Sequence, residues 1–471
     1  MVSIAKTNKS VVNIKRQTKN GQSAIDWRNR PGLLWPSTLT AEGGITMTKI
    51  RKPSFATVAV ALAGCFTLAA QAQEVTVIRA AGYLDVVGGQ VVSPANIVVT
   101  GATITAINPG ALPDAARMVD LPGLTVLPGM IDVHTHLSYE IGPGWSDEPV
   151  KWTTGEYALR SGKNARITLL AGFTTVREMG AAAGFVDVAT MKAIERGDII
   201  GPHIIPAGHA LSITGGHCEP TGFAPGVVEG DYRTGVADGI DAVLKAIRYQ
   251  IKHGARAIKI CATAGVLSFE GPVGAQQYSF EELKAAADET HRHGLKIAAH
   301  AHGTEGIIAA SEAGIDFIEH DSMMTAEAAR IIKKNGTWVT PTLYLTSAID
   351  MQQLPEAIRA KAEYVLPLAD ASFKRAVEMQ LNIAFGTDAG VYPHGENARE
   401  LASRVALGMS PLEAVRSATV YSATALGISD RGQVKAGLMA DLIAVEGNPA
   451  EDVRRLQDVR FVMKGGVVYK Q

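Results

Sequence analysis

Residues 128–140 read PGMIDVHTHLSYE and place two histidines, His134 and His136, at the end of an apolar run. The run alternates like a β-strand, in which side chains two residues apart point to the same face. The two imidazoles therefore share one face of a buried strand. A single strand histidine is more often a hydrogen-bonded core group than a metal ligand, so a metal site needs further donors from elsewhere in the chain.

This stretch is the first of eight strand candidates between about residues 128 and 425, which alternate with amphipathic helices. One helix is bounded by a capping box, Ser279 with Glu282, and by Gly294 at its end. The candidates are MIDVHTH (130–136), FTTVREM (173–179), HIIPAG (203–208), AIKICAT (257–263), KIAAHAH (296–302), FIEH (317–320), WVTPTL (338–343) and IAFGTDA (383–389). Eight βα units in roughly 300 residues predict an α/β fold, a (β/α)8 TIM barrel, with a doubly wound sheet as the alternative.

The two segments that flank this middle part have a different sequence pattern. Residues 73–127 and 430–471 contain short β-branched runs broken by glycine and proline turns. We therefore expect the two segments to pair into one small β-sandwich built from both ends of the mature chain. Residues 128–429 are then expected to form the metal-dependent barrel.

The first 72 residues are not expected to belong to the fold. Residues 1–46 show no strand or helix period and are interpreted as a non-structural upstream extension. From Met47, a cationic start, an apolar stretch and an Ala-Gln-Ala end are typical of a signal peptide over residues 47–72, which makes Met47 the expected start. The apolar stretch of about 16 residues is shorter than a membrane-spanning helix needs. We expect export to the bacterial periplasm or medium, with a lipoprotein anchored through Cys65 in LAGC as the alternative.

Composition limits the possible partners. The chain has 471 residues, of which 46% are hydrophobic and 19% charged, and its formal net charge is -1. This balance predicts a globular protein without the basic footprint that nucleic acid or anionic membrane would require, and leaves small-molecule substrates open. Beyond residue 72 only Cys218 and Cys261 remain, so the chain is no disulfide scaffold, and a single bridge between them is left open.

In a TIM barrel, catalytic groups lie at the C-terminal ends of the strands. In this chain those ends carry imidazoles, a lysine and a carboxylate, a donor set that suits zinc or a similar divalent ion. They are His134 and His136, Lys259, His300 and His302, His320, and Asp388. Five of the twelve histidines end three of the strands, and this joint pattern favours a metal centre over isolated core histidines.

Lys259 alternates with Ile258 and Ile260 in AIKICA. If the isoleucines face the helices, the ammonium points into the barrel interior, where an unpaired charge is costly. One interpretation is a lysine that is salt-bridged to a barrel carboxylate. The other is a neutral amine that has added carbon dioxide, giving a carbamate whose two oxygens can bridge two metal ions.

Together, the HxH pair, the fourth-strand lysine, the later histidines and GTDAG (386–390) resemble the amidohydrolase superfamily. Four stretches resemble its imidazolonepropionase-like branch, which includes Xaa-Pro dipeptidases, Lys/Arg carboxypeptidases and ochratoxin-hydrolysing amidohydrolases. They are ITGGHCEP (213–220), IKICATAGV (258–266), AAHAHGTEGI (298–307) and FGTDAGVYPHGENARE (385–400). The resemblance covers essentially everything after residue 73.

The resemblance implies a centre of two divalent ions, expected to be Zn²⁺, and hydrolysis by a hydroxide that bridges them. His134, His136 and Asp388 are assigned to one ion, His300 and His320 to the other, and carboxylated Lys259 to both. Asp388 would take the proton of the attacking water and pass it to the leaving amine. The expected catalytic residues are thus Asp388, Lys259 and His320.

Four residues are expected to bind substrate. His217, which follows two glycines, is interpreted as a substrate or oxyanion contact, with a structural loop role as the alternative. Resemblance to the dipeptidases implies that Tyr278 holds a substrate carboxylate. His302 lies on the same inward-facing side of its strand as His300. It is expected to contact the metal ligands rather than to bind a metal ion itself. His394, with Asn397, would line the mouth or cap its loop.

The expected reaction is hydrolysis of the amide bond to a C-terminal amino acid in dipeptides or N-acyl amino acids, ochratoxin-type aryl amides included. The loop after the first strand carries Tyr139, Trp145 and Trp152, which suits a bulky apolar group. A cysteine nucleophile at Cys218 lacks a third group to orient its base. The remaining alternatives are a cyclic amidohydrolase of the imidazolonepropionase type and a non-enzymatic metal- or solute-binding barrel. A homo-oligomer is implied by the resemblance alone.

Overall fold

The computed structural model describes residues 74–471. The expected extension (1–46) and signal segment (47–72) lie outside the described residues. Within residues 74–471, no helix is long and apolar enough to cross a membrane.

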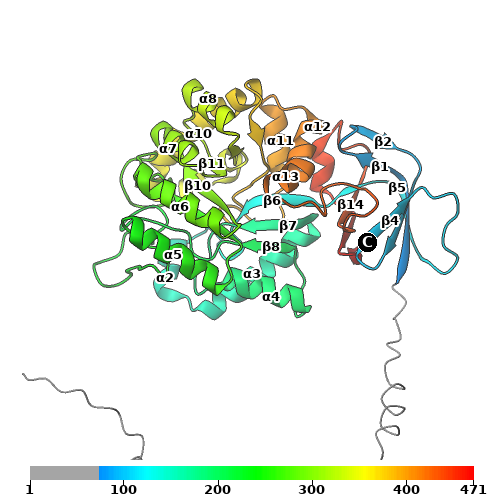
Figure 1. Cartoon of the computed structure of the whole chain (residues 1–471), viewed down its shortest axis with the longest axis horizontal. Helices are drawn as coiled ribbons and strands as arrows, with labels where there is room; N and C mark the ends of the chain where they lie inside the picture. The colour runs from blue at the N-terminus through cyan, green and yellow to red at the C-terminus, as the bar shows by residue number, and fades with distance from the viewer. Residues whose placement is uncertain (1–73) are drawn as a thin grey trace, which may run out of the picture. The chain divides into compact units, whose positions relative to one another are not determined.

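Both ends of the described chain join one β-sheet. Its strands are β1 (Val75–Asp85), β2 (Gln90–Val92), β3 (Ala95–Thr100), β4 (Thr103–Ile107), β5 (Arg117–Pro128), β14 (Leu442–Glu446), β15 (Phe461–Lys464) and β16 (Val467–Lys470). The order is β16-β15-β14-β5-β1-β3-β4, with β2 paired to β1. The antiparallel pairing of β14 with β5 joins the two ends, as expected, and Figure 1 shows it at the right. The sandwich itself stays a prediction, because these strands belong to one hydrogen-bonded sheet.

The middle of the chain contains a strand at each predicted position and in the predicted order, but the eighth strand ends at Ile383, so most of the predicted stretch 383–389 follows it without strand structure. The eight strands are β6 (Met130–Thr135), β7 (Phe173–Glu178), β8 (His203–Pro206), β9 (Ala257–Cys261), β10 (Lys296–Ala301), β11 (Phe317–His320), β12 (Trp338–Thr340) and β13 (Asn382–Ile383). They form two parallel sheets, β6-β7-β8 and β13-β12-β11-β10-β9. Backbone hydrogen bonds connect the sheets at both edges, from Cys261 to Leu211 and from Val133 to Phe385. This arrangement follows the plan of a TIM-barrel-type α/β fold.

Helices alternate with these strands (Figure 1). The longer ones are α3 (Thr154–Leu170), α4 (Val186–Arg196), α5 (Ile240–His253), α6 (Phe280–Arg292), α7 (Thr304–Glu312), α8 (Ala326–Asn335), α10 (Glu356–Glu378) and α11 (Arg399–Ala406). Shorter helical segments are η1 (Trp145–Asp147), α2 (Glu148–Lys151), α9 (Leu345–Ala348), η2 (Met351–Gln353), α12 (Pro411–Arg416), η3 (Ser417–Tyr421), α13 (Ser422–Ala425) and η4 (Val453–Gln457). The predicted capping box is confirmed at α6, where Ser279 and Glu282 each accept the other's backbone N–H.

The register of the parallel strands decides which side chains face the interior. Lys259 lies opposite Ala298 on β10, while Cys261 lies opposite His300 and His300 opposite Glu319. The two isoleucines that flank Lys259 belong to the apolar core that the strands share with the helices. The predicted inward orientation of Lys259 is therefore confirmed, and a carboxylate shares its face.

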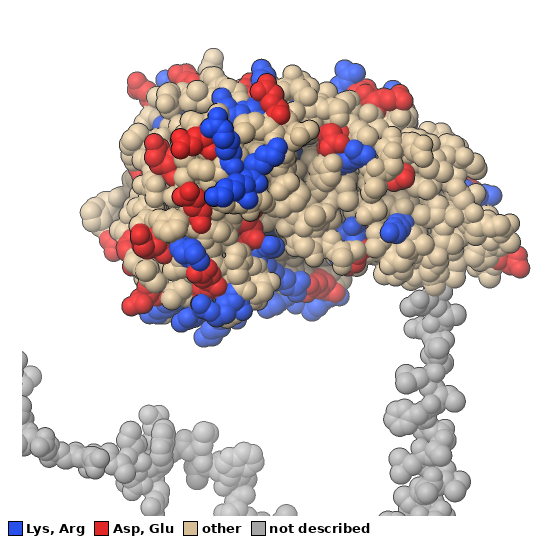
Figure 2. Space-filling view, turned by 45° about the horizontal axis from the view of Figure 1, so that its top comes forward, with Lys and Arg blue, Asp and Glu red and all other residues tan. Residues whose placement is uncertain are grey.

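The surface carries charges of both signs. Figure 2 shows Lys and Arg side chains interspersed with Asp and Glu on the face drawn. This agrees with the near-zero net charge of the whole chain, which is -1.

Candidate metal centre and active site

Asp388 lies between the two histidines of the first barrel strand. Its Oδ1 atom is 3.4 Å from Nε2 of His134 and 3.2 Å from Nε2 of His136. The Nζ atom of Lys259 is 3.5 Å from the same nitrogen of His134. Strands β6 and β9 and the segment after β13 thus bring four of the six predicted ligands into one small volume.

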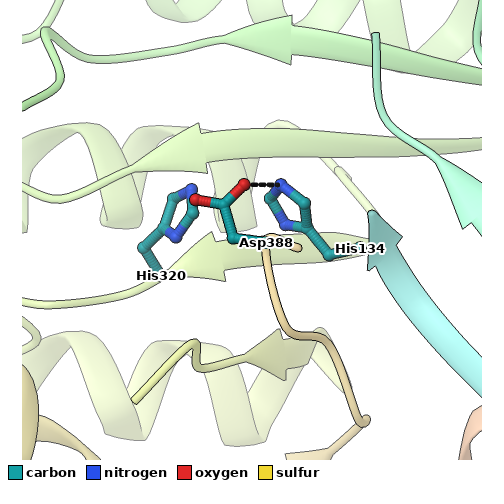
Figure 3. A group of neighbouring side chains, drawn as sticks. All are labelled: His134, His320 and Asp388. Atoms are coloured by element: carbon teal, nitrogen blue, oxygen red, sulfur yellow. Dashed lines mark ion pairs between the residues drawn. The ribbon is translucent and has the colours of Figure 1, made fainter. Parts of the chain in front are cut away.

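The other two predicted ligands close the group from β10 and β11. The ring centroid of His320 is 4.9 Å from that of His134 and 4.8 Å from that of His300. One donor atom each from His134, His320 and Asp388 lies within 4.8 Å of the others. Figure 3 shows the Asp388 carboxylate between the two rings.

These residues have the protonation states that a divalent cation needs. Burial lowers the pKa of His134 to about 4 and the pKa values of His300 and His320 well below their ordinary value. The imidazoles are therefore neutral at pH 7. His136 Nδ1 and His300 Nε2 are buried without a hydrogen-bond partner. Imidazole nitrogens without a protein partner, beside a carboxylate, are donors that zinc-like ions prefer, so the described residues fit such an ion.

Two of these residues adopt an unusual backbone conformation. His320 and Asp388 have φ angles of 72° and 60°, in the left-handed region that non-glycine residues rarely occupy. Strand alternation alone would point His320 away from the interior, because its neighbour Glu319 already faces inward. The left-handed conformation at the end of β11 turns the imidazole back toward the other donors. Such strain is tolerated where the surrounding structure requires it, as at many active sites.

A buried network, which the sequence analysis missed, supports the segment that carries Asp388. The carboxylate of Asp132 accepts hydrogen bonds from Thr387 Oγ1 at 2.6 Å and Asn397 Nδ2 at 2.9 Å. Its other oxygen accepts the backbone N–H of His134 at 3.1 Å. Asn397 therefore lies within this network and ties the segment after β13 to β6. Only the position of Asp132 two residues before His134 could have signalled this role.

Two of the predicted substrate contacts, Tyr278 and His394, make hydrogen bonds within the protein. Tyr278 is fully buried, and its hydroxyl donates a hydrogen bond to the carbonyl of Ala237 at 3.1 Å. His394 uses both ring nitrogens, one with Thr168 Oγ1 at 3.0 Å and the other toward the carbonyl of His136 at 3.2 Å. A substrate contact by either residue stays a prediction, and for His394 these contacts fit the alternative role of capping its loop. Packing of α6 and of the segment after β13 decides both positions, and no local pattern reveals it.

The other two predicted contacts lie beside the donor group. The ring of His302 stacks on His320 at a centroid distance of 5.1 Å, and its Nδ1 is 2.9 Å from Ser322 Oγ. The ring of His217 is 4.1 Å from that of His300. Both residues therefore remain candidates for contact with a molecule bound at this centre.

The loop after β9 is built around His217. Nδ1 of His217 is 2.5 Å from Ser268 Oγ and 3.5 Å from Glu270 Oε1. A Cβ atom on Gly265 would lie 2.2 Å from the imidazole, so only glycine fits there. Lys361 on α10 fastens the loop by donating to the carbonyls of Ser268 at 3.0 Å and Glu270 at 2.8 Å. The sequence analysis missed these loop residues, which follow the strand by several positions.

The contacts of the Glu270 carboxylate should make stability depend on pH. Burial alone would raise the pKa of Glu270, but its contacts with His217, Ser268 and Gly265 hold it at about 2. Because this folded value lies below the ordinary 4.5, the stabilisation is present above about pH 4.5 and lost toward about pH 2. The free energy of unfolding, measured in urea, should be higher for wild type than for Glu270→Gln. This difference should be largest at neutral pH and should shrink as the pH falls.

The control for this prediction is Glu281→Gln on the exposed side of α6, which should change little at any pH. A difference between wild type and Glu270→Gln that stays constant from neutral pH to pH 3 would contradict the stabilising contacts of the ionised Glu270 carboxylate.

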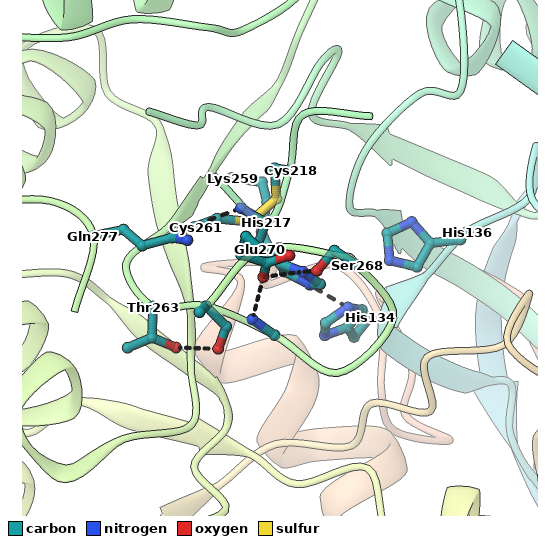
Figure 4. The surroundings of a disulfide bond; sticks show 12 residues. His134, His136, His217, Cys218, Lys259, Cys261, Thr263, Ser268, Glu270 and Gln277 are labelled. Carbon is teal, nitrogen blue, oxygen red and sulfur yellow. Dashed lines mark hydrogen bonds and ion pairs between the residues drawn. A yellow bond between two sulfur atoms is a disulfide. The ribbon is translucent and has the colours of Figure 1, made fainter. Parts of the chain in front are cut away.

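A disulfide connects the His217 loop to the lysine strand. Cys218 and Cys261 are bonded, with their Cα atoms 6.0 Å apart, and Figure 4 shows the bridge beside His217 and Lys259. This separation is usual for disulfides. The bridge answers the question that the two cysteines left open, and it removes Cys218 as a candidate nucleophile because no free thiol remains.

The bridge should stabilise the fold. For a sequence separation of 43, chain entropy predicts a loss of roughly 4 kcal/mol in the double variant Cys218→Ser/Cys261→Ser. Denaturant unfolding of wild type and of the double variant, each with and without reductant, would measure this loss of stability. Reductant should destabilise wild type and leave the double variant unchanged. Equal stability of all four samples would refute the prediction.

Comparison with known proteins agrees with this geometry. Residues 125–470 match the profile of the Amidohydrolase family. The chain belongs to the amidohydrolase family. Ochratoxinase of Aspergillus niger is 33% identical to this amidohydrolase over 374 residues, which cover 73% of this chain and 75% of the relative. Imidazolonepropionase of Deinococcus radiodurans is 25% identical over 399 residues, covering 77% of this chain and 88% of the relative.

Solved structures extend the comparison to the fold. A crystal structure of a Xaa-Pro dipeptidase with bound methionine in the active site has 38% identity and a TM-score of 0.81, covering 84% of this chain and 100% of that one. The crystal structure of A. niger ochratoxinase has 29% identity and a TM-score of 0.75, covering 84% and 96%. This amidohydrolase thus has a TIM-barrel-type α/β fold and is a hydrolase that acts on amide bonds. The non-enzymatic alternative is set aside.

Proposed function

We propose that this amidohydrolase hydrolyses the amide bond to a C-terminal amino acid in dipeptides or N-acyl amino acids, including ochratoxin-type aryl amides. The observation that carries the proposal is the convergence of the six predicted donors at one end of the strands. Similarity to an ochratoxinase and to a Xaa-Pro dipeptidase structure supports the substrate class. Hydrolysis of a cyclic amide is the second candidate, favoured by similarity to imidazolonepropionase.

The proposed centre holds two divalent ions, which we expect to be Zn²⁺. His134, His136 and Asp388 would hold one ion, His300 and His320 the other, with carboxylated Lys259 between them. Hydrogen bonds support this assignment, because His134 Nδ1 is 2.8 Å from Glu319 and His320 Nδ1 is 2.8 Å from Thr342. With Nδ1 engaged in each ring, Nε2 is the nitrogen that would bind an ion. Such ions polarise the scissile carbonyl and make a water molecule more acidic.

In the proposed mechanism, Asp388 moves the proton. Burial alone would raise the pKa of Asp388, but His136 and His134 beside it hold the pKa below its ordinary value. The carboxylate is therefore anionic at neutral pH and can accept a proton from the attacking water, then give it to the leaving amine. His217 and His302, beside the donors, are proposed to contact the substrate or its developing oxyanion.

Lys259 is proposed to be carboxylated. Its amine nitrogen would bond to the carbon of carbon dioxide and lose a proton, leaving a carbamate. Burial lowers the pKa of Lys259 to about 8, so a larger share of the amine is neutral than in an exposed lysine.

Apolar side chains above the strand ends suit a bulky substrate group. Trp145, from the loop after β6, packs with Leu354 and Ile358. The ring of Tyr139 lies 5.5 Å from that of His136. Trp152 is engaged elsewhere, because the Arg160 guanidinium stacks on it at 3.7 Å. Of the three predicted aromatic residues, only Tyr139 therefore lies beside a proposed ligand and supports this part of the proposal.

A hydrolysis screen by mass spectrometry tests the proposed function. Zinc-loaded protein would be incubated with Xaa-Pro, Xaa-Lys/Arg and Xaa-Phe dipeptides, N-aroyl-phenylalanines including ochratoxin, and cyclic amides. We expect release of a free C-terminal amino acid, and loss of that activity in Asp388→Asn. Turnover of cyclic amides alone would favour the second candidate, and turnover of none of these substrates would refute both.

The remaining proposals concern the domains of the chain, its export and its assembly. We propose that residues 73–127 and 430–471 form a composite β-sandwich and that residues 128–429 form the (β/α)8 barrel. Residues 47–72 would direct export, or Cys65 would carry a lipid anchor, and the folded chains would assemble as a homo-oligomer.

A further inference from the structure

A fully buried ion pair lies behind the proposed metal centre. Glu319 on β11 and Arg177 on β7 both have 0% side-chain exposure, and Arg177 Nη2 is 2.5 Å from Glu319 Oε1. Arg177 also donates to the carbonyl of Val133 at 2.6 Å, and its guanidinium lies 3.9 Å from the ring centre of Phe317. The other oxygen of Glu319 is 2.8 Å from Nδ1 of His134. Neither charged residue was singled out by the sequence patterns.

We propose that Glu319 is the positioning residue of the centre, acting through His134 and held in place by Arg177. The proposal rests on the proposed metal centre and names no further ligand. An anionic carboxylate can only accept a hydrogen bond, so it selects the tautomer of His134 that carries its proton on Nδ1. The lone pair of that tautomer is on Nε2, the atom that faces Lys259 and Asp388.

Arg177 orients this carboxylate through its 2.5 Å contact with Glu319 Oε1. The two Arg177 contacts come from different strands, so the guanidinium fixes Glu319 relative to the backbone just before His134. Three strands, β6, β7 and β11, are thus connected through one hydrogen-bond chain that ends at a proposed metal ligand.

The same barrel contains a matched ion pair that contacts no proposed ligand. Glu400 and Arg404 also have 0% side-chain exposure and lie 2.9 Å apart. The second oxygen of Glu400 accepts the backbone N–H groups of Leu343 and Tyr344, each at 2.8 Å. A purely structural ion pair should therefore behave like Glu400–Arg404 when it is neutralised.

The experiment compares Glu319→Gln with Glu400→Gln. Both variants should unfold at lower denaturant concentration than wild type, because each leaves an arginine buried without its counter-ion. The affinity for Zn²⁺, measured by competition with a chromogenic chelator, should fall about 10- to 100-fold in Glu319→Gln only. Equal affinities in the two variants would refute the positioning role.

A second variant covers the case in which Glu319→Gln does not fold. Glu319→Gln/Arg177→Met removes both charges, and neutral replacement of a buried ion pair is often well tolerated. The affinity for Zn²⁺ should again fall about 10- to 100-fold. A folded double variant with wild-type affinity would overturn the proposal.

Zn²⁺ binding is measured without substrate, so this proposal and the proposed function can fail separately. Wild type that binds Zn²⁺ but hydrolyses nothing in the screen would refute only the substrate class. Wild type that binds no Zn²⁺ would overturn both.

Discussion

Replacing Asp388 by asparagine should lower kcat/KM for amide hydrolysis by roughly 10²- to 10⁴-fold, the usual contribution of a positioned proton-transfer group. Asparagine keeps the size of the side chain but cannot accept the proton of the attacking water. Because the neighbouring histidines remain, the fold should persist, and circular dichroism should match that of wild type. Steady-state kinetics on the best substrate of the screen would measure the effect.

The matched control is Asp441→Asn. Asp441 is also buried, with 3% exposure, but it precedes β14 and its carboxylate accepts the backbone N–H of Gly465. This variant should keep its kcat/KM even if it loses stability. Full activity in Asp388→Asn would exclude Asp388 as the proton carrier.

Replacing Lys259 by methionine should remove the proposed bridge between the two ions. Methionine keeps the length and apolar stem of the side chain but cannot form a carbamate. Metal ions of this kind stabilise a transition state by several kcal/mol. Losing that stabilisation corresponds to a fall in kcat/KM of more than about 10³-fold. Zinc content by plasma mass spectrometry should drop below two ions per chain, and the same samples should show the loss of hydrolysis.

Lys464→Met is the control for this prediction. Lys464 is a second buried lysine, with 8% exposure, and its Nζ donates to the carbonyl of Gly201 at 2.6 Å. This variant should keep its zinc and its activity. If Lys259→Met also kept both, Lys259 would be the salt-bridged structural lysine that the sequence left as an alternative.

Local sequence patterns were sufficient for the positions of the strands and for the orientation of the proposed ligands inside them. Alternation with period 2 predicted that His134 and His136 share a face and that Lys259 points inward, because strand geometry alone decides these orientations. The capping box at Ser279 was predictable for the same reason, since its two hydrogen bonds join residues three positions apart.

The surroundings of those ligands depended on residues far apart in the chain. Tyr278 and His394 were expected at the substrate, yet packing engages both with other groups. Glu319, which is next to a predicted ligand, was missed because its partners Arg177 and His134 come from other strands. A one-dimensional pattern contains no information on which buried charges will meet.

The amino-acid sequence thus determined the α/β arrangement and the set of donor residues. Both follow from the order of apolar runs, turn residues and strand-end histidines, because local geometry repeats along the chain. The tertiary structure alone decided how the donors are held. It gave His320, at the end of β11, the left-handed backbone conformation that turns its ring toward the other donors. It also joined Cys218 to Cys261 and connected His134 through Glu319 to Arg177. These features depend on contacts between residues far apart in the sequence, and only the packed core brings those residues together.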